Sequence, residues 1–316
     1  MHSIGNGWLW TGFFFFVLMV LSIDIFFLGR GKSHRVSTRE SLSWTVIWVL
    51  CALAFNYLLW WYLHQSHGIH FANQKAEEFF TGYLIEEALS VDNMFAFLLV
   101  FNYFLVPEEY QRRVLLYGVL GAIVMRFLMI FAGIWLVLKI HWILYLFGLF
   151  LVITGIKMFF MKEKEGLSDN SLLSWLRRRF RVTEKFHGER FFVRQNAMWY
   201  VTPLFLALIL IEVSDLVFAL DSIPAVFAIT QDPFIVFTSN IFAILGLRTL
   251  YFLLARMAAR FHLLKWGIAI MLMFIGTKML IAPWIEIPVE ISLGVVAATL
   301  VTSALLSLVI PKHKIR

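Results

Sequence analysis

Long apolar runs separated by short polar segments dominate this 316-residue chain. Each run is close to the roughly twenty residues that a helix needs to cross a bilayer, and the polar–apolar alternation of an outer-membrane barrel is missing. The pattern therefore predicts an all-α polytopic membrane protein with about nine transmembrane helices. These predicted helices are residues 8–28, 44–63, 79–106, 114–138, 142–161, 199–229, 234–255, 264–282 and 289–310.

The composition points to the same class of protein. The chain is 61% apolar and only 15% charged, whereas soluble domains are about 45–50% apolar. A soluble domain is thereby excluded. The first apolar run lacks the basic n-region and the small-residue cleavage site of a signal peptide, so we expect it to stay as the first span.

Basic residues predict the orientation. If the N-terminus lies outside, most of the 27 Lys and Arg residues fall in inner segments, and cytoplasmic loops retain Lys and Arg. We therefore expect a cytoplasmic C-terminus and no nucleic-acid partner, since the net charge of +7 mainly reflects insertion. In the longest inner segment, apolar residues alternate with arginines over residues 171–181. This pattern is typical of an amphipathic helix on the surface of the lipid bilayer.

Acidic residues interrupt two of the predicted spans with the same spacing. Glu86 stands six residues before Asp92 in the third span, and Asp215 stands six residues before Asp221 in the sixth. Carboxylates at membrane depth cost about 2.5–3.5 kcal/mol each, so those that remain usually face a cavity or an ion path. We expect the two stretches to build one cation site.

The similarity extends to a repeat of three spans. Arg126 and Arg248 each lie in the middle of the span that follows an acidic stretch, and the segment 155–158 returns as 276–279. With nine spans the two copies run in opposite directions, which is the inverted-repeat plan of secondary transporters. We predict repeats at 79–161 and 199–282. The flanking parts are two helices in 1–78, a basic loop with the surface helix in 162–198, and a last helix with a basic tail in 283–316.

The residues next to these acids suggest the kind of ion. Asn93 follows Asp92 as Ser222 follows Asp221, and Pro224 is expected to break the helix and free a backbone carbonyl. Carboxylate, amide, hydroxyl and carbonyl oxygens are hard ligands that suit Mg²⁺, Ca²⁺ and Mn²⁺. Cys and His are missing from both stretches, which disfavours Cu⁺ and makes Zn²⁺ a poorer candidate.

The acids outnumber the arginines in the spans. Glu87 and Glu212 add to the four acids already named, against only Arg126 and Arg248. We expect the arginines to balance part of the charge, with Glu87 as an ion-pair partner and Glu212 either a partner or a ligand. The remaining acids must bind a cation or a proton, because crowded like charges in a low-dielectric site favour neutral forms. Proton-coupled antiport of a divalent metal ion is therefore our hypothesis.

The segments 82–86, 90–93, 211–215 and 218–225, together with 117–122 and 239–248, resemble the TerC family of bacterial membrane proteins, and within it the Alx branch. The resemblance covers nearly the whole chain. It implies a manganese exporter of the inner membrane, linked to alkaline pH, in a family first named for tellurium resistance. Mn²⁺ would be the transported substrate, and no cofactor is implied. By motif position, the ion-handling residues would be Glu86, Asp92, Asn93, Glu212, Asp215, Asp221 and Ser222.

Other classes of function stay open. An exporter of amino acids or other small solutes would use Arg126 and Arg248 to bind a substrate carboxylate, whereas a scaffold or assembly factor would use the basic loop. The sequence contains no pairing of a nucleophile with a base that would indicate an active site, so we expect that the protein is not an enzyme. His64, His67 and His70 recur at the spacing of a metal site, but solvated histidines in a polar loop are the favoured interpretation. A homo-oligomer is compatible with the sequence.

Overall fold

The computed structural model describes residues 3–30, 38–140, 142–160, 179–183, 185–195, 198–257, 263–285 and 287–309. This part of the chain forms helices and one small hairpin of strands, which confirms the all-α prediction. The elements are α1 (Gly7–Arg30), α2 (Thr38–His67), α3 (Ile69–Tyr103), α4 (Glu108–Lys139), α5 (Ile143–Phe160), β1 (Phe192–Gln195), β2 (Met198–Val201), α7 (Pro203–Phe227), α8 (Pro233–Met257), α9 (Leu264–Ile281) and α10 (Val289–Val309).

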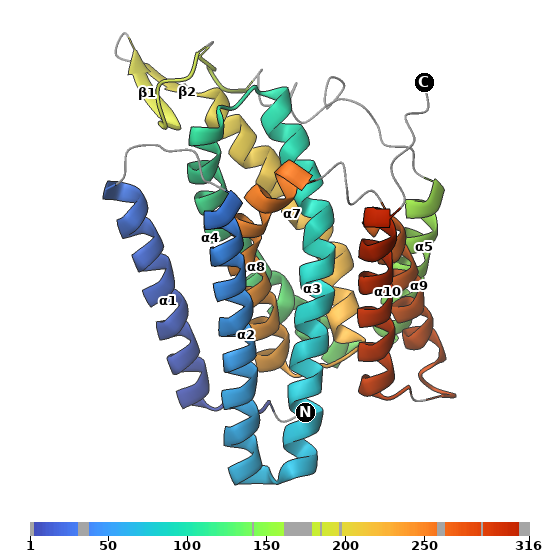
Figure 1. Ribbon diagram of the computed structural model, residues 1–316. Coiled ribbons are helices and arrows are strands. Elements are labelled where there is room, and N and C mark those ends of the chain that lie inside the picture. The colour runs from blue at the N-terminus through green and yellow to red at the C-terminus, as the bar shows by residue number, and fades with distance from the viewer. Residues whose placement is uncertain are drawn as a thin grey trace.

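The helices cross the height of the molecule side by side (Figure 1). α1 begins at the end where α2 passes into α3, and α10 ends toward the other end, which carries the β1–β2 hairpin. We call these the α2–α3 end and the hairpin end. Of the described helices, α2, α4, α7, α8, α9 and α10 are long and apolar enough to span a membrane. α1 and α5 contain shorter apolar stretches, and α3 is the longest helix but carries the acids.

The outward faces of the helices are apolar. Trp8, Phe15 and Leu18 of α1 are all more than 60% exposed, as is Val309 of α10. Contiguous exposed apolar surface is unfavourable in water and favourable in lipid. The protein is therefore a multi-pass integral membrane protein.

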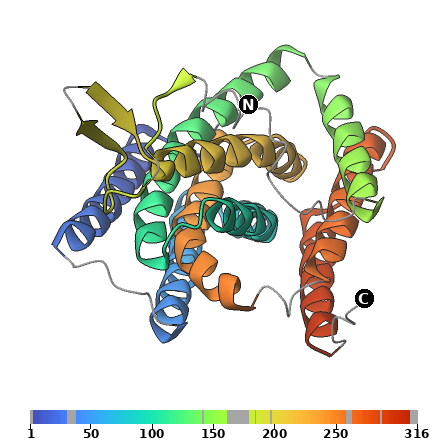
Figure 2. The same ribbon diagram turned by 90° about the horizontal axis from the view of Figure 1, so that it is seen from above.

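The central helices are α3, α4, α7 and α8, and each of them packs against two or more of the others. Figure 2 shows α5, α9 and α10 as a group beside this centre. α3 runs toward the hairpin end whereas α7 runs away from it, so the two helices lie against each other in opposite directions (Figure 1).

α5 and α9 meet through reciprocal close contacts. A Cβ placed on Gly155 of α5 would lie 2.8 Å from the Ala269 carbonyl, and one placed on Gly276 of α9 would lie 2.6 Å from the Gly148 carbonyl. Only glycine lets the backbones approach so closely. Two oppositely directed copies of one three-helix unit would make such paired contacts. The boundaries of the two repeats and of the other predicted segments stay a prediction.

Two boundaries of predicted helices were wrong. Residues 64–78, which separate the predicted second and third spans, are helical on both sides of Gly68, because α2 continues to His67 and α3 begins at Ile69. Most polar side chains of this stretch lie on the exposed faces of these helices, whereas Glu78 is buried. The span expected from residue 199 begins instead at Pro203, since residues 198–201 pair with 192–195 as an antiparallel hairpin. The amphipathic helix predicted at 171–181 lies almost entirely outside the described residues.

Candidate cation site

A network of buried polar side chains joins the four central helices. Glu86 of α3 and Arg126 of α4 form an ion pair, and both side chains are almost completely buried. Arg126 Nη1 also donates to Asn240 Oδ1 of α8 at 2.6 Å. Arg126 Nη2 lies 3.6 Å from Asp215 Oδ1 of α7, and Asn93 Nδ2 donates to the same oxygen at 3.1 Å. We call these five residues the central cluster.

Helical spacing brings these side chains together. Glu86 and Asn93 are seven residues apart on α3, as are Asp215 and Ser222 on α7, and seven residues return to nearly the same face of a helix. The two faces meet because α3 and α7 pack against each other. Ser222 consequently lies beside the Glu86 carboxylate. The pairing of residues from the third and sixth spans therefore follows directly from the sequence periodicity.

Oxygen atoms in and beside the central cluster lack hydrogen bonds of normal geometry. They are Glu86 Oε2, Asn93 Oδ1 and Asp215 Oδ2, and also Ser222 Oγ, which lies next to Glu86. Buried polar atoms nearly always have a partner, so several orphans at one place require an explanation. A hard cation such as Mg²⁺, Ca²⁺ or Mn²⁺ binds this mixture of carboxylate, amide and hydroxyl oxygens.

Asp221 does not join the central cluster. It faces α5, where Thr154 Oγ1 donates to Asp221 Oδ1 at 3.2 Å and Lys157 lies near enough to interact with the carboxylate. The expected helix break is also missing, because α7 continues through Pro224 to Phe227. An unbroken helix turns neighbouring residues by about 100°, so Asp221 and Ser222 point to different helices. The predicted convergence of Asp221 with Asp215 was therefore wrong.

Two further acids that the sequence singled out have no hydrogen bond to the central cluster. Glu212 of α7 lies against Gly121 of α4, where an added Cβ would overlap its carboxylate. Glu87 of α3 is half-buried near Gly246 of α8. Each of these two carboxylates has one buried oxygen without a hydrogen bond. The side chain of Asp92 lies outside the described residues.

The structure places both predicted charge-balancing arginines and shows ring contacts for two of the three histidines. Arg126 lies in the central cluster, and Arg248 is buried on α8. The ring of His64 stacks on Trp60, and the ring of His67 stacks on Phe71. Among the side chains that the structure describes, no three of the types His, Cys, Asp and Glu lie close enough together to hold a metal ion. A site at the central cluster would therefore use two carboxylates together with neutral oxygens.

Sequence reasoning missed Asn240, which accepts a hydrogen bond from Arg126. The signal was present, because a fully buried asparagine in an apolar span is expensive unless it is hydrogen-bonded. Its Nδ2 donates to the Val236 carbonyl at 3.1 Å, which fixes the direction of its Oδ1. Asn240 therefore belongs to the framework that orients the guanidinium.

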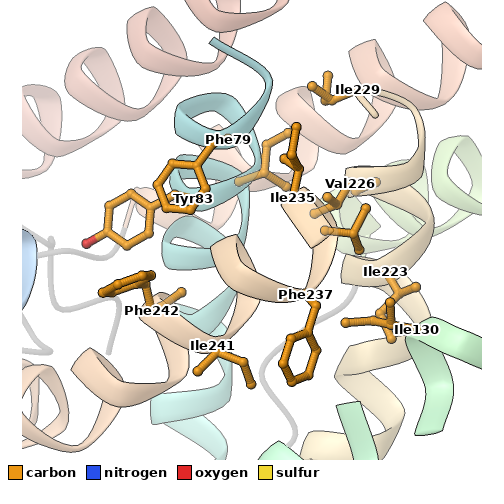
Figure 3. Close-up of a cluster of buried hydrophobic side chains, with 14 of the residues drawn as sticks. Phe79, Tyr83, Ile130, Ile223, Val226, Ile229, Ile235, Phe237, Ile241 and Phe242 are labelled. Atoms are coloured by element: carbon orange, nitrogen blue, oxygen red, sulfur yellow. The ribbon is translucent and has the colours of Figure 1, made fainter. Parts of the chain in front are cut away.

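Apolar side chains close the central cluster on both sides. Figure 3 shows the group toward the α2–α3 end, where Phe79 and Tyr83 of α3 meet Ile223 and Val226 of α7 and Phe237 of α8. A second group, toward the hairpin end, includes Met94, Phe97, Phe101, Leu210 and Tyr251. The described side chains thus hold the cluster in a closed, water-poor environment.

A cavity of about 380 Å³ opens at the hairpin end beyond the second group. Its lining includes Phe101, Tyr251, Gln111, Glu108 and Asn102. The Tyr251 hydroxyl donates to Gln111 Oε1 at 3.0 Å, and the rings of Phe101 and Tyr251 meet edge to face with centroids 5.6 Å apart. Leu98, which also lines the cavity, is five residues from Asn93 on α3, which is about 7.5 Å along a helix. The cavity therefore ends roughly one and a half turns short of the central cluster.

Comparison with known proteins identifies relatives over the whole chain. The family model described as "Integral membrane protein TerC family" matches residues 71–314. A protein of Photorhabdus laumondii named "Putative membrane-bound redox modulator Alx" is 50% identical over 99% of this chain and 98% of its own. A protein of Escherichia coli strain K12 with the same name is 51% identical over 97% of this chain and 96% of its own. The Myxococcus xanthus protein named "Uncharacterized membrane protein STKORF319" is 45% identical over 98% of this chain and 95% of its own.

No solved structure matches. The family match covers α3 to α10, which include every residue of the central cluster. The agreement in length and identity with three relatives shows that the resemblance is not confined to a single motif. On this evidence the chain belongs to the TerC family of integral membrane proteins.

Proposed function

We propose that this protein exports a divalent metal cation, Mn²⁺ in the first place, across the inner membrane of a bacterium in exchange for protons. The observation that carries the proposal is the set of orphan oxygens on Glu86, Asn93, Asp215 and Ser222. They lie at the meeting point of two oppositely directed helices, which is where secondary transporters bind substrates and coupling ions.

The charges of the cluster suit exchange of a cation. Glu86 and Asp215 supply two negative charges, and Arg126 supplies one positive charge. A divalent ion bound between the two carboxylates balances their negative charge. Once the ion has left, that negative charge must be balanced in another way. Protons are the available replacement, because isolated carboxylates in a low-dielectric interior favour the neutral form. Export of the metal would thereby be coupled to proton entry.

The cavity supplies a path from one side. With the N-terminus outside, as the basic residues predict, the hairpin end faces the cytoplasm. Glu108, Asn102 and Gln111 place oxygen atoms around the cavity, which attract a cation from that side. Export would require the pair of Phe101 and Tyr251 to separate on loading, and the group of Phe79, Tyr83 and Phe237 to separate on release.

The name of the Alx relatives points to redox chemistry instead. Cys51 is the one cysteine in this sequence, so this chain cannot form or reduce an intrachain disulfide.

The export of small solutes is disfavoured by the geometry, because Arg126 already contacts two carboxylates and an amide oxygen. A substrate carboxylate would have to displace both acids.

Uptake of Mn²⁺ into inverted membrane vesicles tests the proposal. Asp215→Asn keeps the shape of the side chain and leaves Glu86 paired with Arg126, so the protein should fold while uptake is lost. The matched control is Glu189→Gln, which removes an acid from a surface ion pair with Arg113 and should leave uptake unchanged. Equal uptake by wild type and Asp215→Asn, at equal protein levels, would falsify the proposed site.

A further inference from the structure

The guanidinium of Arg126 occupies the place that a metal ion needs. It contacts Glu86 and lies 3.6 Å from Asp215 Oδ1, and these are the two carboxylates of the proposed site. Only 1% of the Arg126 side chain is exposed, and the described residues around it belong to α3, α7 and α8. A metal ion bound to both carboxylates would lie within a few ångströms of this positive charge.

A third contact holds the guanidinium through the same nitrogen that contacts Glu86. Asn240 Oδ1 accepts a hydrogen bond from Arg126 Nη1, and the Asn240 side chain is itself held by its bond to the Val236 carbonyl. Asn240 is uncharged, so its contact with Arg126 persists when a cation takes the carboxylates. A lysine would keep the charge but not the planar fork with which Nη2 lies near Asp215 while Nη1 contacts Glu86 and Asn240.

We propose that Arg126 is a tethered cation that competes with the transported metal ion for Glu86 and Asp215. Asn240 acts as a positioning residue that retains the guanidinium when the metal takes the carboxylates. In the empty protein Arg126 neutralises part of the carboxylate charge, so the site can reorient across the membrane without cargo. When the metal is present, its repulsion weakens binding and promotes release. This inference rests on the proposed function.

The proposal makes opposite predictions for two neighbouring residues. Arg126→Gln removes the competing charge, so Mn²⁺ should bind about tenfold more tightly, while the maximal export rate should fall about tenfold because release and empty return become slow. Asn240→Ala removes the neutral anchor, so the guanidinium stays on the carboxylates and Mn²⁺ should bind more weakly. Arg126→Lys keeps the charge, and its affinity should lie nearer to that of wild type than to that of Arg126→Gln.

The experiment measures Mn²⁺ binding to the purified full-length protein and Mn²⁺ transport in vesicles, for wild type and the three variants. Arg113→Gln, at the surface ion pair, is the control for loss of an arginine and should change neither quantity. If both residues merely hold the fold together, Arg126→Gln and Asn240→Ala will both weaken binding, which overturns the proposal. If Arg126→Gln does not fold, Asn240→Ala alone still tests the proposal, because tighter Mn²⁺ binding by Asn240→Ala would contradict the positioning role of Asn240.

The same measurements distinguish failure of the Arg126 role from failure of the proposed function. If wild type binds and transports Mn²⁺ but Arg126→Gln binds no more tightly, the proposed function stands and the competing role of Arg126 is wrong. If neither wild type nor Arg126→Gln binds Mn²⁺, the proposed function itself fails, and the inference fails with it.

Discussion

Two clusters of buried acids lie on the central helices, and they differ in how fully their oxygens are hydrogen-bonded. In the central cluster, Glu86 Oε2 and Asp215 Oδ2 have no partner. Near the α2–α3 end, Glu78 Oε1 accepts from Gln74, and Glu78 Oε2 accepts from Lys75 Nζ at 2.7 Å and from Thr230 Oγ1 at 2.6 Å. We call this second group the end cluster.

The end cluster continues into the turn between α7 and α8. Asp232 Oδ1 accepts from Ser3 Oγ at 3.0 Å and from the Phe234 amide at 2.9 Å, and Asp232 Oδ2 accepts from the Ile4 amide at 2.8 Å. Thr230 connects Asp232 to Glu78, because its hydroxyl also accepts from the Asp232 amide. These bonds fasten α3, the α7–α8 turn and the start of the chain together.

This contrast is the one we expect if the acids of the end cluster hold the fold and those of the central cluster bind the proposed cation. A fully bonded buried carboxylate fixes one arrangement of its partners, whereas a partly bonded one leaves a costly orphan. An acid whose role is only structural is expected to have all its buried oxygens hydrogen-bonded, because each buried oxygen without a partner destabilises the fold. The orphans of the central cluster are therefore better explained by a ligand, and the following experiments test that distinction.

The largest expected effect is on stability, at Glu86. Glu86→Gln leaves the buried Arg126 charge with only the longer contact to Asp215, so the free energy of unfolding should fall by about 3 kcal/mol. Adding Arg126→Gln removes the poorly paired charge and should restore part of that loss. Reversible unfolding in mixed micelles measures both values. Strictly additive losses in the double variant would show that the pair does not interact.

A smaller effect is expected in the end cluster. Glu78→Gln weakens the bonds to Lys75 and Thr230, so the free energy of unfolding should fall by about 1–3 kcal/mol. Transport per folded molecule should stay the same, because no orphan oxygen lies on Glu78. The same unfolding assay and vesicle uptake, with Asp215→Asn for comparison, measure the two quantities. Lost uptake in a folded Glu78→Gln protein would contradict the division into two kinds of cluster.

Glu212 lies outside both clusters, and a substitution at Gly121 tests whether its carboxylate is fixed in place or can move toward the central cluster. Gly121→Ala places a Cβ against the Glu212 carboxylate, which should cost about 1 kcal/mol of stability, the low end of the overpacking range, because the flexible end of the Glu212 side chain can turn aside. Gly12→Ala on α1 is the matched control, because nothing lies within 4 Å of its added Cβ, and it should be neutral or slightly stabilising. Equal stability of the two variants would show that Glu212 has room to move toward the central cluster.

The sequence predicted the parts of the site that depend on one helix and its periodicity. Glu86 and Asn93 stand seven residues apart in the sequence, as do Asp215 and Ser222, and the structure brings these two pairs together. The direction of Asp221 could not be predicted, because it depends on whether Pro224 breaks α7 and on what α5 offers in contact. Asn240 was missed for a similar reason, since its partner Arg126 comes from another helix.

The smallest predicted effect compares two neighbours on α7. Ser222 lies beside Glu86 with an orphan hydroxyl, whereas Asp221 faces Thr154. Ser222→Ala removes one neutral oxygen from the proposed site, so Mn²⁺ affinity should fall by about three- to tenfold, the effect of one neutral hydrogen-bond-sized contact. The free energy of unfolding should fall by at most about 1 kcal/mol, because the hydroxyl's polar neighbour is the Glu86 carboxylate and no bond of normal geometry joins them. Thr154→Ala, which removes the hydroxyl that faces Asp221, should leave Mn²⁺ affinity unchanged. Measured binding to the purified variants decides between them, and a larger loss in Thr154→Ala than in Ser222→Ala would move the cation site from the central cluster toward α5.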